Sequence, residues 1–209
     1  TAWDGYEEIP AWIMQGYGTM AMEAGEQLKA QGCERPTHIF VQAGVGSLAG
    51  AVVGYFANLY ADNPPTFVVV EAEAAACLYK GAAAGDGDIR IVDGDMQTIM
   101  AGLACGEPNT ISWDILKNHV KVFIAAPDWV AANGMRMLAA PIKGDASITS
   151  GESGAAPFGA LAAMTTLDEY EQLKKDIGLD ENSRVLLFST EGDTDPDRYK
   201  NIVWKGLDK

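Results

Sequence analysis

The chain has 209 residues, of which 48% are hydrophobic, and a formal net charge of −14. Its length and hydrophobic content suit one sizeable folded core and exclude a disordered chain. The negative charge argues against nucleic acid and anionic membranes as partners, because it repels phosphate groups and no basic stripe offsets it. Since the apolar runs are also too short to span a bilayer, we expect a soluble, cytoplasmic protein.

In chain order, the residue pattern predicts helices that alternate with strands. A helix begins at Pro10 and stops at Gly32, and further helices are expected at 47–60, 72–84, 96–103, 111–118, 128–139 and 155–166, then a short charged helix from 167. Strands are expected at 37–43, 66–71, 120–124 and 184–188. This alternation predicts an α/β fold with a three-layer α-β-α arrangement around an open, mostly parallel sheet.

The cysteines and histidines predict no metal site. Cys33, Cys77 and Cys105 have no C-x-x-C spacing, and the chain has only two histidines. Free thiols are the expected state of these cysteines. A disulfide between Cys77 and Cys105 stays open as an alternative, and it would require Cα atoms within about 7 Å of each other.

A glycine-spaced turn joins the strand at 37–43 to the next helix. Gly44 and Gly46 give the backbone conformational freedom, and the helix that starts near Ser47 directs its unpaired N–H groups toward the turn. The pattern is typical of a cradle for a phosphate group, although such turns also serve packing alone. A dinucleotide is a weaker alternative: Glu71 at the next strand end suits a ribose, but the third glycine of that motif is missing.

Two further polar turns are expected at the same edge of the sheet, where parallel α/β folds bind ligands. The first, 150–155, leads into a helix, and its Ser153 suits an ordinary helix N-cap. The second, 189–192, follows the last strand and offers the hydroxyls of Ser189 and Thr190, either of which is suited to bond a ring nitrogen or to serve as a plain turn residue.

The order of these motifs resembles that of the tryptophan synthase β-like, or fold type II, pyridoxal phosphate (PLP) enzymes. The matching segments are 16–23 with its Gly-x-Gly-Thr pattern, the Val-Glu strand end at 68–71, the glycine turn, Gly-Glu-Ser-Gly-Ala at 151–155, and Ser-Thr-Glu-Gly at 189–192. The resemblance covers essentially the whole chain. Longer strings at 3–10, 12–17 and 42–50 are similar to those of the diaminopropionate ammonia-lyases within this group.

Membership of that family would imply α,β-elimination of ammonia from 2,3-diaminopropionate, giving pyruvate and ammonia, in a PLP-dependent homodimer. Related alternatives are a serine or threonine dehydratase, or a catalytically silent fragment that binds a phosphate ligand. A hydroxyl at the pyridine nitrogen, rather than a carboxylate, favours elimination over transamination because it weakens the electron sink.

The resemblance also implies roles for single residues. Backbone donors for the cofactor phosphate would come from Gly44, Val45, Gly46, Ser47 and Leu48. Thr190 or its neighbour Ser189 would face the pyridine nitrogen, and Glu152 and Ser153 would line the other edge of the cofactor. Asp4 is a candidate acid or base, with a solvated loop charge as its alternative.

The resemblance implies that the lysine bound to the cofactor lies in an earlier segment. We therefore interpret residues 1–209 as the C-terminal portion of one fold type II domain, which supplies part of an active site and is inactive alone. The other half would be a further segment or a separate chain.

Overall fold

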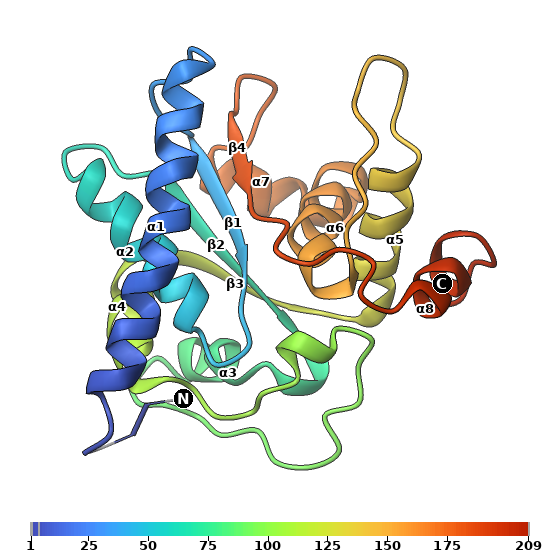
Figure 1. The fold of residues 1–209 in the computed structure, drawn as a ribbon. Coiled ribbons are helices and arrows are strands. Elements are labelled where there is room, and N and C mark those ends of the chain that lie inside the picture. Colours follow the sequence, from blue (N-terminus) through green and yellow to red (C-terminus); the bar gives the residue numbers. More distant parts are fainter. Residues whose placement is uncertain (1, 4, 209) are drawn as a thin grey trace.

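A computed structural model describes residues 2–3 and 5–208. Its sheet contains β1 (His38–Gln42), β2 (Thr66–Ala72), β3 (Val120–Ala126) and β4 (Val185–Leu187), in the order β3-β2-β1-β4. All three neighbouring pairs are parallel (Figure 1). This confirms the open parallel sheet that the sequence predicts.

Helices cover both faces of the sheet (Figure 1). One face carries α1 (Glu8–Ala30), α2 (Ser47–Leu59), α3 (Cys77–Ala84) and α4 (Thr110–His119). The other carries α5 (Asp128–Ala139), α6 (Glu152–Thr166), α7 (Glu171–Ile177) and α8 (Pro196–Val203). Alternate residues of β1 serve the two layers: Ile39 and Val41 pack into the first core, and Phe40 into the second. The three-layer prediction is confirmed.

Some predicted helices differ from the observed ones. The predicted helix at 72–84 begins only at Cys77, because residue 72 ends β2 and a short 3-10 turn, η1 (Glu73–Ala75), follows it. The segment 96–100 has no regular secondary structure, and a second 3-10 turn, η2 (Ala101–Leu103), follows. The Glu71 side chain caps the start of α3, and Asp128 binds Thr98 and Ile99. Local propensity does not reveal such contacts. The sequence analysis also missed α8, whose start carries the usual signals: Asp195 accepts from the backbone N–H of Arg198, and Pro196 is in the first turn.

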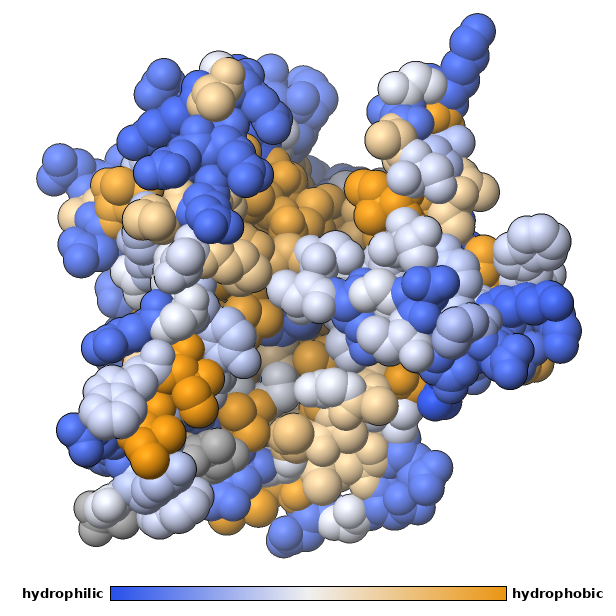
Figure 2. Space-filling model, in the orientation of Figure 1, coloured by the Kyte–Doolittle hydropathy of each residue, from blue (hydrophilic) through white to orange (hydrophobic). Residues whose placement is uncertain are grey.

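The edge strand β4 pairs only with β1 among the described strands. Hollows of about 580 and 430 Å³ flank it, one against α6 and α7 and one against α1. Figure 2 shows apolar surface over this edge and also over the first turns of α1, where Ile9 and Ile13 are about half exposed.

Two properties of the described residues bear on the earlier predictions. The cysteines Cys33, Cys77 and Cys105 are free thiols, so the alternative of a disulfide between Cys77 and Cys105 was wrong. None of the helices described is both long enough and apolar enough to cross a membrane.

The contact between α2 and α4 provides a test of the packing. A Cβ atom added to Gly50 would lie 2.6 Å from Ser112 Cβ, whereas one added to Gly54, a turn further along α2, would meet Ile115 at an ordinary 3.7 Å. We expect Gly50→Ala to lower the free energy of unfolding by about 1–3 kcal/mol because the helices must separate. Gly54→Ala, the control, should be neutral or stabilising by up to about 1 kcal/mol. Urea unfolding of both variants measures this, and equal effects would contradict the packing described.

Candidate functional site

A cavity of about 330 Å³ lies at the carboxyl end of β1. Its walls come from α1, the turn between β1 and α2, η2, the start of α6 and the segment after β4. Its lining residues are Tyr17, Gln42, Ala43, Gly44, Val45, Gly46, Ser47, Leu48, Gly102, Leu103, Cys105, Ser153, Thr190 and Glu191. The structure thus brings together seven predicted site residues: the five of the glycine turn, Ser153 and Thr190.

The turn before α2 depends on Gly46. This residue has a φ of +98°, and a Cβ atom there would lie 3.0 Å from Ser112 Oγ and 3.1 Å from Leu116 Cδ1. Only glycine fits this left-handed conformation without strain. Because Gly46 is also the N-cap, no side chain caps α2, and the N–H groups of Ser47 and Leu48 are available at the cavity wall. An anion is the ligand that such a helix start favours.

Asn109 holds this turn in place. It is fully buried, and its Oδ1 caps α4 by accepting from the N–H groups of Ile111 (3.0 Å) and Ser112 (3.2 Å). Its Nδ2 donates to Ser47 Oγ at 2.8 Å, and its own backbone N–H donates to Val45 O at 2.7 Å. The sequence analysis missed Asn109, although an asparagine just before a helix is a recognisable N-cap signal.

Opposite the turn, Thr190 lines the cavity. The side chain of Gln42, the last residue of β1, donates from Nε2 to Thr190 Oγ1 at 2.9 Å. Ser189 is outside the lining, and its hydroxyl lies 2.8 Å from that of Ser150. Of the two hydroxyls that the sequence left open, the one at the cavity is therefore Thr190. Gln42 was missed because its partner is 148 residues away in the chain.

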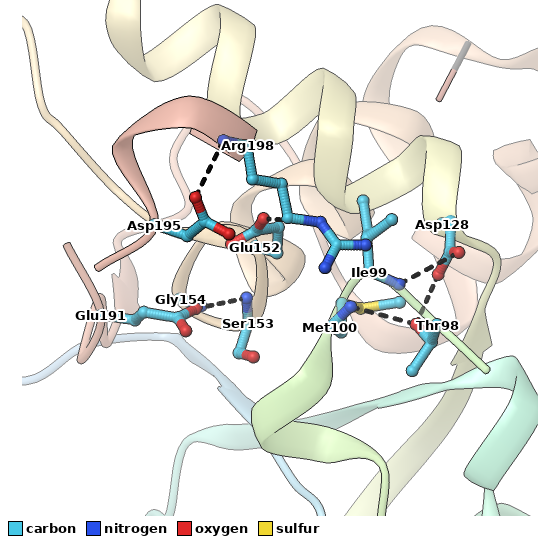
Figure 3. A network of polar contacts seen from close by, with 10 residues as sticks. All are labelled: Thr98, Ile99, Met100, Asp128, Glu152, Ser153, Gly154, Glu191, Asp195 and Arg198. Atoms are coloured by element: carbon cyan, nitrogen blue, oxygen red, sulfur yellow. Dashed lines mark hydrogen bonds and ion pairs between the residues drawn. The ribbon is translucent and has the colours of Figure 1, made fainter. Parts of the chain in front are cut away.

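The start of α6 is capped from another element (Figure 3). Glu191 Oε2 accepts from the N–H groups of Ser153 at 2.7 Å and Gly154 at 3.3 Å. Ser153 is therefore not the N-cap, as the sequence analysis allowed; the N-cap position is Gly151. The buried Ser153 Oγ has no hydrogen-bond partner among the described residues. An unpaired buried hydroxyl in a cavity wall is costly unless a ligand bonds it.

Glu152 does not line the cavity. Its carboxylate lies 3.5 Å from Arg198 Nε, an ion pair without hydrogen-bond geometry that connects α6 to α8 (Figure 3). Burial raises the pKa of Glu152, and the nearby charges of Glu191 and Asp195 add to this effect.

The remaining wall contains Gly102, and Asp128 fixes its position. The first turn of α5 places Asp128 so that it accepts from Thr98 Oγ1 and, at 3.2 Å, from the N–H of Ile99 (Figure 3). These contacts hold the segment before η2 in a conformation without regular secondary structure, so only 101–103 of the predicted helix at 96–103 is helical.

Glu71 faces away from the cavity. It is 1% exposed, and its two oxygens accept from the N–H groups of Leu78 (2.8 Å) and Tyr79 (2.7 Å), which starts α3 at Cys77. Both oxygens are therefore occupied within the protein, and the ribose-binding interpretation of Glu71 loses its support. Burial raises the pKa of Glu71 to about 7.

Two other predictions were that Asp4 is a candidate acid or base and that the cysteines and histidines form no metal site. Asp4, the candidate acid or base, lies outside the described residues. Within residues 2–3 and 5–208, His, Cys, Asp and Glu side chains form no group of three or more that could hold a metal ion.

The donors at the cavity fit PLP. The free N–H groups of α2 suit a phosphate ester, and Ser153 Oγ is a buried hydroxyl without a partner among the described residues. The cavity is also lined by Thr190, whose neutral hydroxyl is suited to bond a ring nitrogen. No lysine occurs among the described residues that line the cavity.

Comparison with known proteins identifies the family. Residues 4–190 match the model of the pyridoxal-phosphate dependent enzyme family. The chain belongs to this family. Its members use PLP as cofactor, and PLP is therefore the cofactor that this chain's family membership indicates.

Relatives include the diaminopropionate ammonia-lyases of Salmonella typhimurium, 54% identical over 207 residues, and of Escherichia coli K12, 48% identical over 206 residues. Each alignment covers 99% of this chain and 51% of the relative. A solved structure of the E. coli diaminopropionate ammonia-lyase, in complex with an aminoacrylate-PLP azomethine reaction intermediate, has a TM-score of 0.92 and 46% identity. It matches 100% of this chain and 52% of its own. The chain thus spans about half the length of the relatives it matches.

The raised pKa of Glu71 predicts how stability depends on pH. The folded state holds the Glu71 proton more tightly than the unfolded state, whose carboxyl pKa is near 4.5. Stability should therefore fall as pH rises from about 5 to about 8, by up to roughly 3 kcal/mol relative to Glu71→Gln, which has no such proton to lose. Urea unfolding across this pH range measures the difference. The exposed Glu73→Gln is the control, and a wild-type curve parallel to that of Glu71→Gln would contradict the prediction.

Proposed function

We propose that the protein containing this chain is a PLP-dependent ammonia-lyase that acts on 2,3-diaminopropionate. The observation that carries the proposal is the cavity at the end of β1, where an uncapped helix start faces the neutral hydroxyl of Thr190. The identities of 48–54% to diaminopropionate ammonia-lyases support this substrate. The overall reaction converts one diaminopropionate and one water into pyruvate and two ammonia molecules.

When bound, PLP withdraws electrons from the α-carbon of an attached amino acid. The residues of this chain bind the cofactor and orient it. The N–H groups of Gly44, Val45, Gly46, Ser47 and Leu48 hold the phosphate, and Asn109 keeps their turn rigid through Ser47 and Val45. Ser153 lines the neighbouring wall, where Glu191 fixes its backbone.

Thr190, rather than Ser189, faces the pyridine nitrogen in this proposal. A hydroxyl carries no charge, so it bonds the ring without strengthening the electron sink as a carboxylate would. Release of a β-substituent needs less stabilisation of negative charge than transamination does. Glu152 lies behind the wall with Arg198 and contributes by supporting α6.

The lysine that binds the cofactor covalently comes, in this proposal, from the part of the protein that corresponds to the uncovered half of the relatives. The support is that the described cavity lining contains no lysine and that the alignments cover 51% of each relative. The homodimer, the cytoplasmic location and the assignment of 1–209 to one C-terminal domain portion stay predictions.

The function is tested by assaying the protein that contains this chain with several amino acids. We expect kcat/KM for 2,3-diaminopropionate to exceed that for serine and threonine by about tenfold or more, because the leaving group is an amine rather than a hydroxyl. Ammonia and pyruvate should appear in a ratio of two to one. A preference for a hydroxy amino acid would identify a dehydratase instead.

The position of the lysine is tested by reducing the PLP-loaded protein with borohydride and mapping the modified peptide. We expect one stoichiometric adduct, on a lysine outside these 209 residues. The chain alone should give only partial modification spread over exposed lysines. A stoichiometric adduct within the chain, for example on Lys80, would contradict the proposal, and a loaded protein that forms no adduct would indicate a silent binder.

A further inference from the structure

Gln42 is a buried amide beside the cavity that the proposed chemistry does not use. Its side chain is in the core at the carboxyl end of β1, and the residue is only 2% exposed. Its one hydrogen bond among the described residues runs from Nε2 to Thr190 Oγ1, at 2.9 Å. Thr190 itself is exposed at the cavity. Gln42 therefore reaches the site only through Thr190.

The direction of this bond decides what Thr190 offers to a ligand. A threonine hydroxyl has one hydrogen and two lone pairs. Because the Gln42 NH₂ group occupies a lone pair, the hydrogen of Thr190 remains free. The described residues provide no other hydrogen bond to Thr190, which is exposed to solvent at the cavity. Once a ligand displaces that solvent, the acceptor for this hydrogen has to come from the ligand.

The amide orientation follows from its surroundings. With Nε2 toward Thr190, one N–H of the amide is paired, and the other N–H and Oε1 are left without a partner among the described residues. The reversed amide would pair Oε1 with the Thr190 hydroxyl but leave both N–H donors of the buried NH₂ group unpaired, so the observed orientation has one fewer unpaired buried donor. The observed orientation is therefore the favoured one.

We propose that Gln42 is a positioning residue that makes Thr190 a hydrogen-bond donor to an unprotonated ring nitrogen of the cofactor. The inference rests on the proposed function. A protonated ring nitrogen would need an acceptor and would leave the hydrogen of Thr190 without a partner. An amide suits this role because it does not titrate, so the direction of the bond is the same at every physiological pH.

The experiment uses the holoenzyme that contains this chain, loaded with PLP that carries ¹⁵N in the pyridine ring. We expect the ¹⁵N NMR signal of the wild type at the position of an unprotonated pyridine. Gln42→Glu substitutes a carboxylate, which only accepts, so Thr190 donates to it and turns a lone pair toward the ring. The ¹⁵N signal should then move to that of a protonated pyridine.

Two variants separate this effect from general damage. Gln15→Glu adds the same charge at an exposed position of α1 and should leave the ¹⁵N signal unchanged. Gln42→Leu removes the bond without reversing it, so Thr190 is free either to donate or to accept. The ¹⁵N signal of this variant should therefore fall between those of the wild type and Gln42→Glu.

The outcomes distinguish a failure of the role of Gln42 from a failure of the proposed function. A protonated ring nitrogen in the wild type, which needs no variant to observe, overturns the role of Gln42 and leaves the proposed function standing. A ¹⁵N signal of an unprotonated ring nitrogen in a folded, PLP-loaded Gln42→Glu variant also overturns the role of Gln42 and leaves the proposed function standing. A wild-type protein that binds no PLP overturns the proposed function together with this inference.

Discussion

The site depends on one helix start that the protein leaves without an acceptor of its own. The N-cap of α2 is a glycine, so the N–H groups of its first turn find no side-chain oxygen. Leaving them free has a cost in stability, and the surrounding contacts keep the turn from relaxing to avoid it. Asn109 is central here, because its amide caps α4 with the oxygen and holds Ser47 with the nitrogen. One buried side chain thus fixes the starts of two helices, α4 and α2.

Two other helix starts near the sheet differ from that of α2, because they have side-chain acceptors within the protein. The carboxyl group of Glu71, from β2, accepts from the N–H groups at the start of α3, and that of Glu191, from beyond β4, accepts at the start of α6. The N–H groups at both helix starts therefore already have acceptors within the protein. The start of α2 keeps its partial positive charge at the cavity wall, in a chain whose net charge is −14. In the proposed function, local dipoles rather than the overall charge would provide the affinity for phosphate.

Sequence patterns predicted the strands, their parallel direction and the glycine turn because those features have local causes. Runs such as Val68–Val70 and the spacing of Gly44 and Gly46 determine their own conformations. The contacts between walls have no local cause. Gln42 meets Thr190 only because β4 lies beside β1, and Glu191 reaches α6 only across that same junction. A strand order cannot be read from the separate strands, so these residues escaped prediction.

One wall of the site is attached to a strand of three residues. Thr190 and Glu191 follow β4, which is held in the sheet by β1 alone among the described strands. If this edge frays, the proposed contact of Thr190 with the cofactor ring and the cap of α6 are released in the same event. Cofactor retention and amide hydrogen exchange at β4 should therefore report the same local opening, and whatever covers this edge also slows the escape of the ligand.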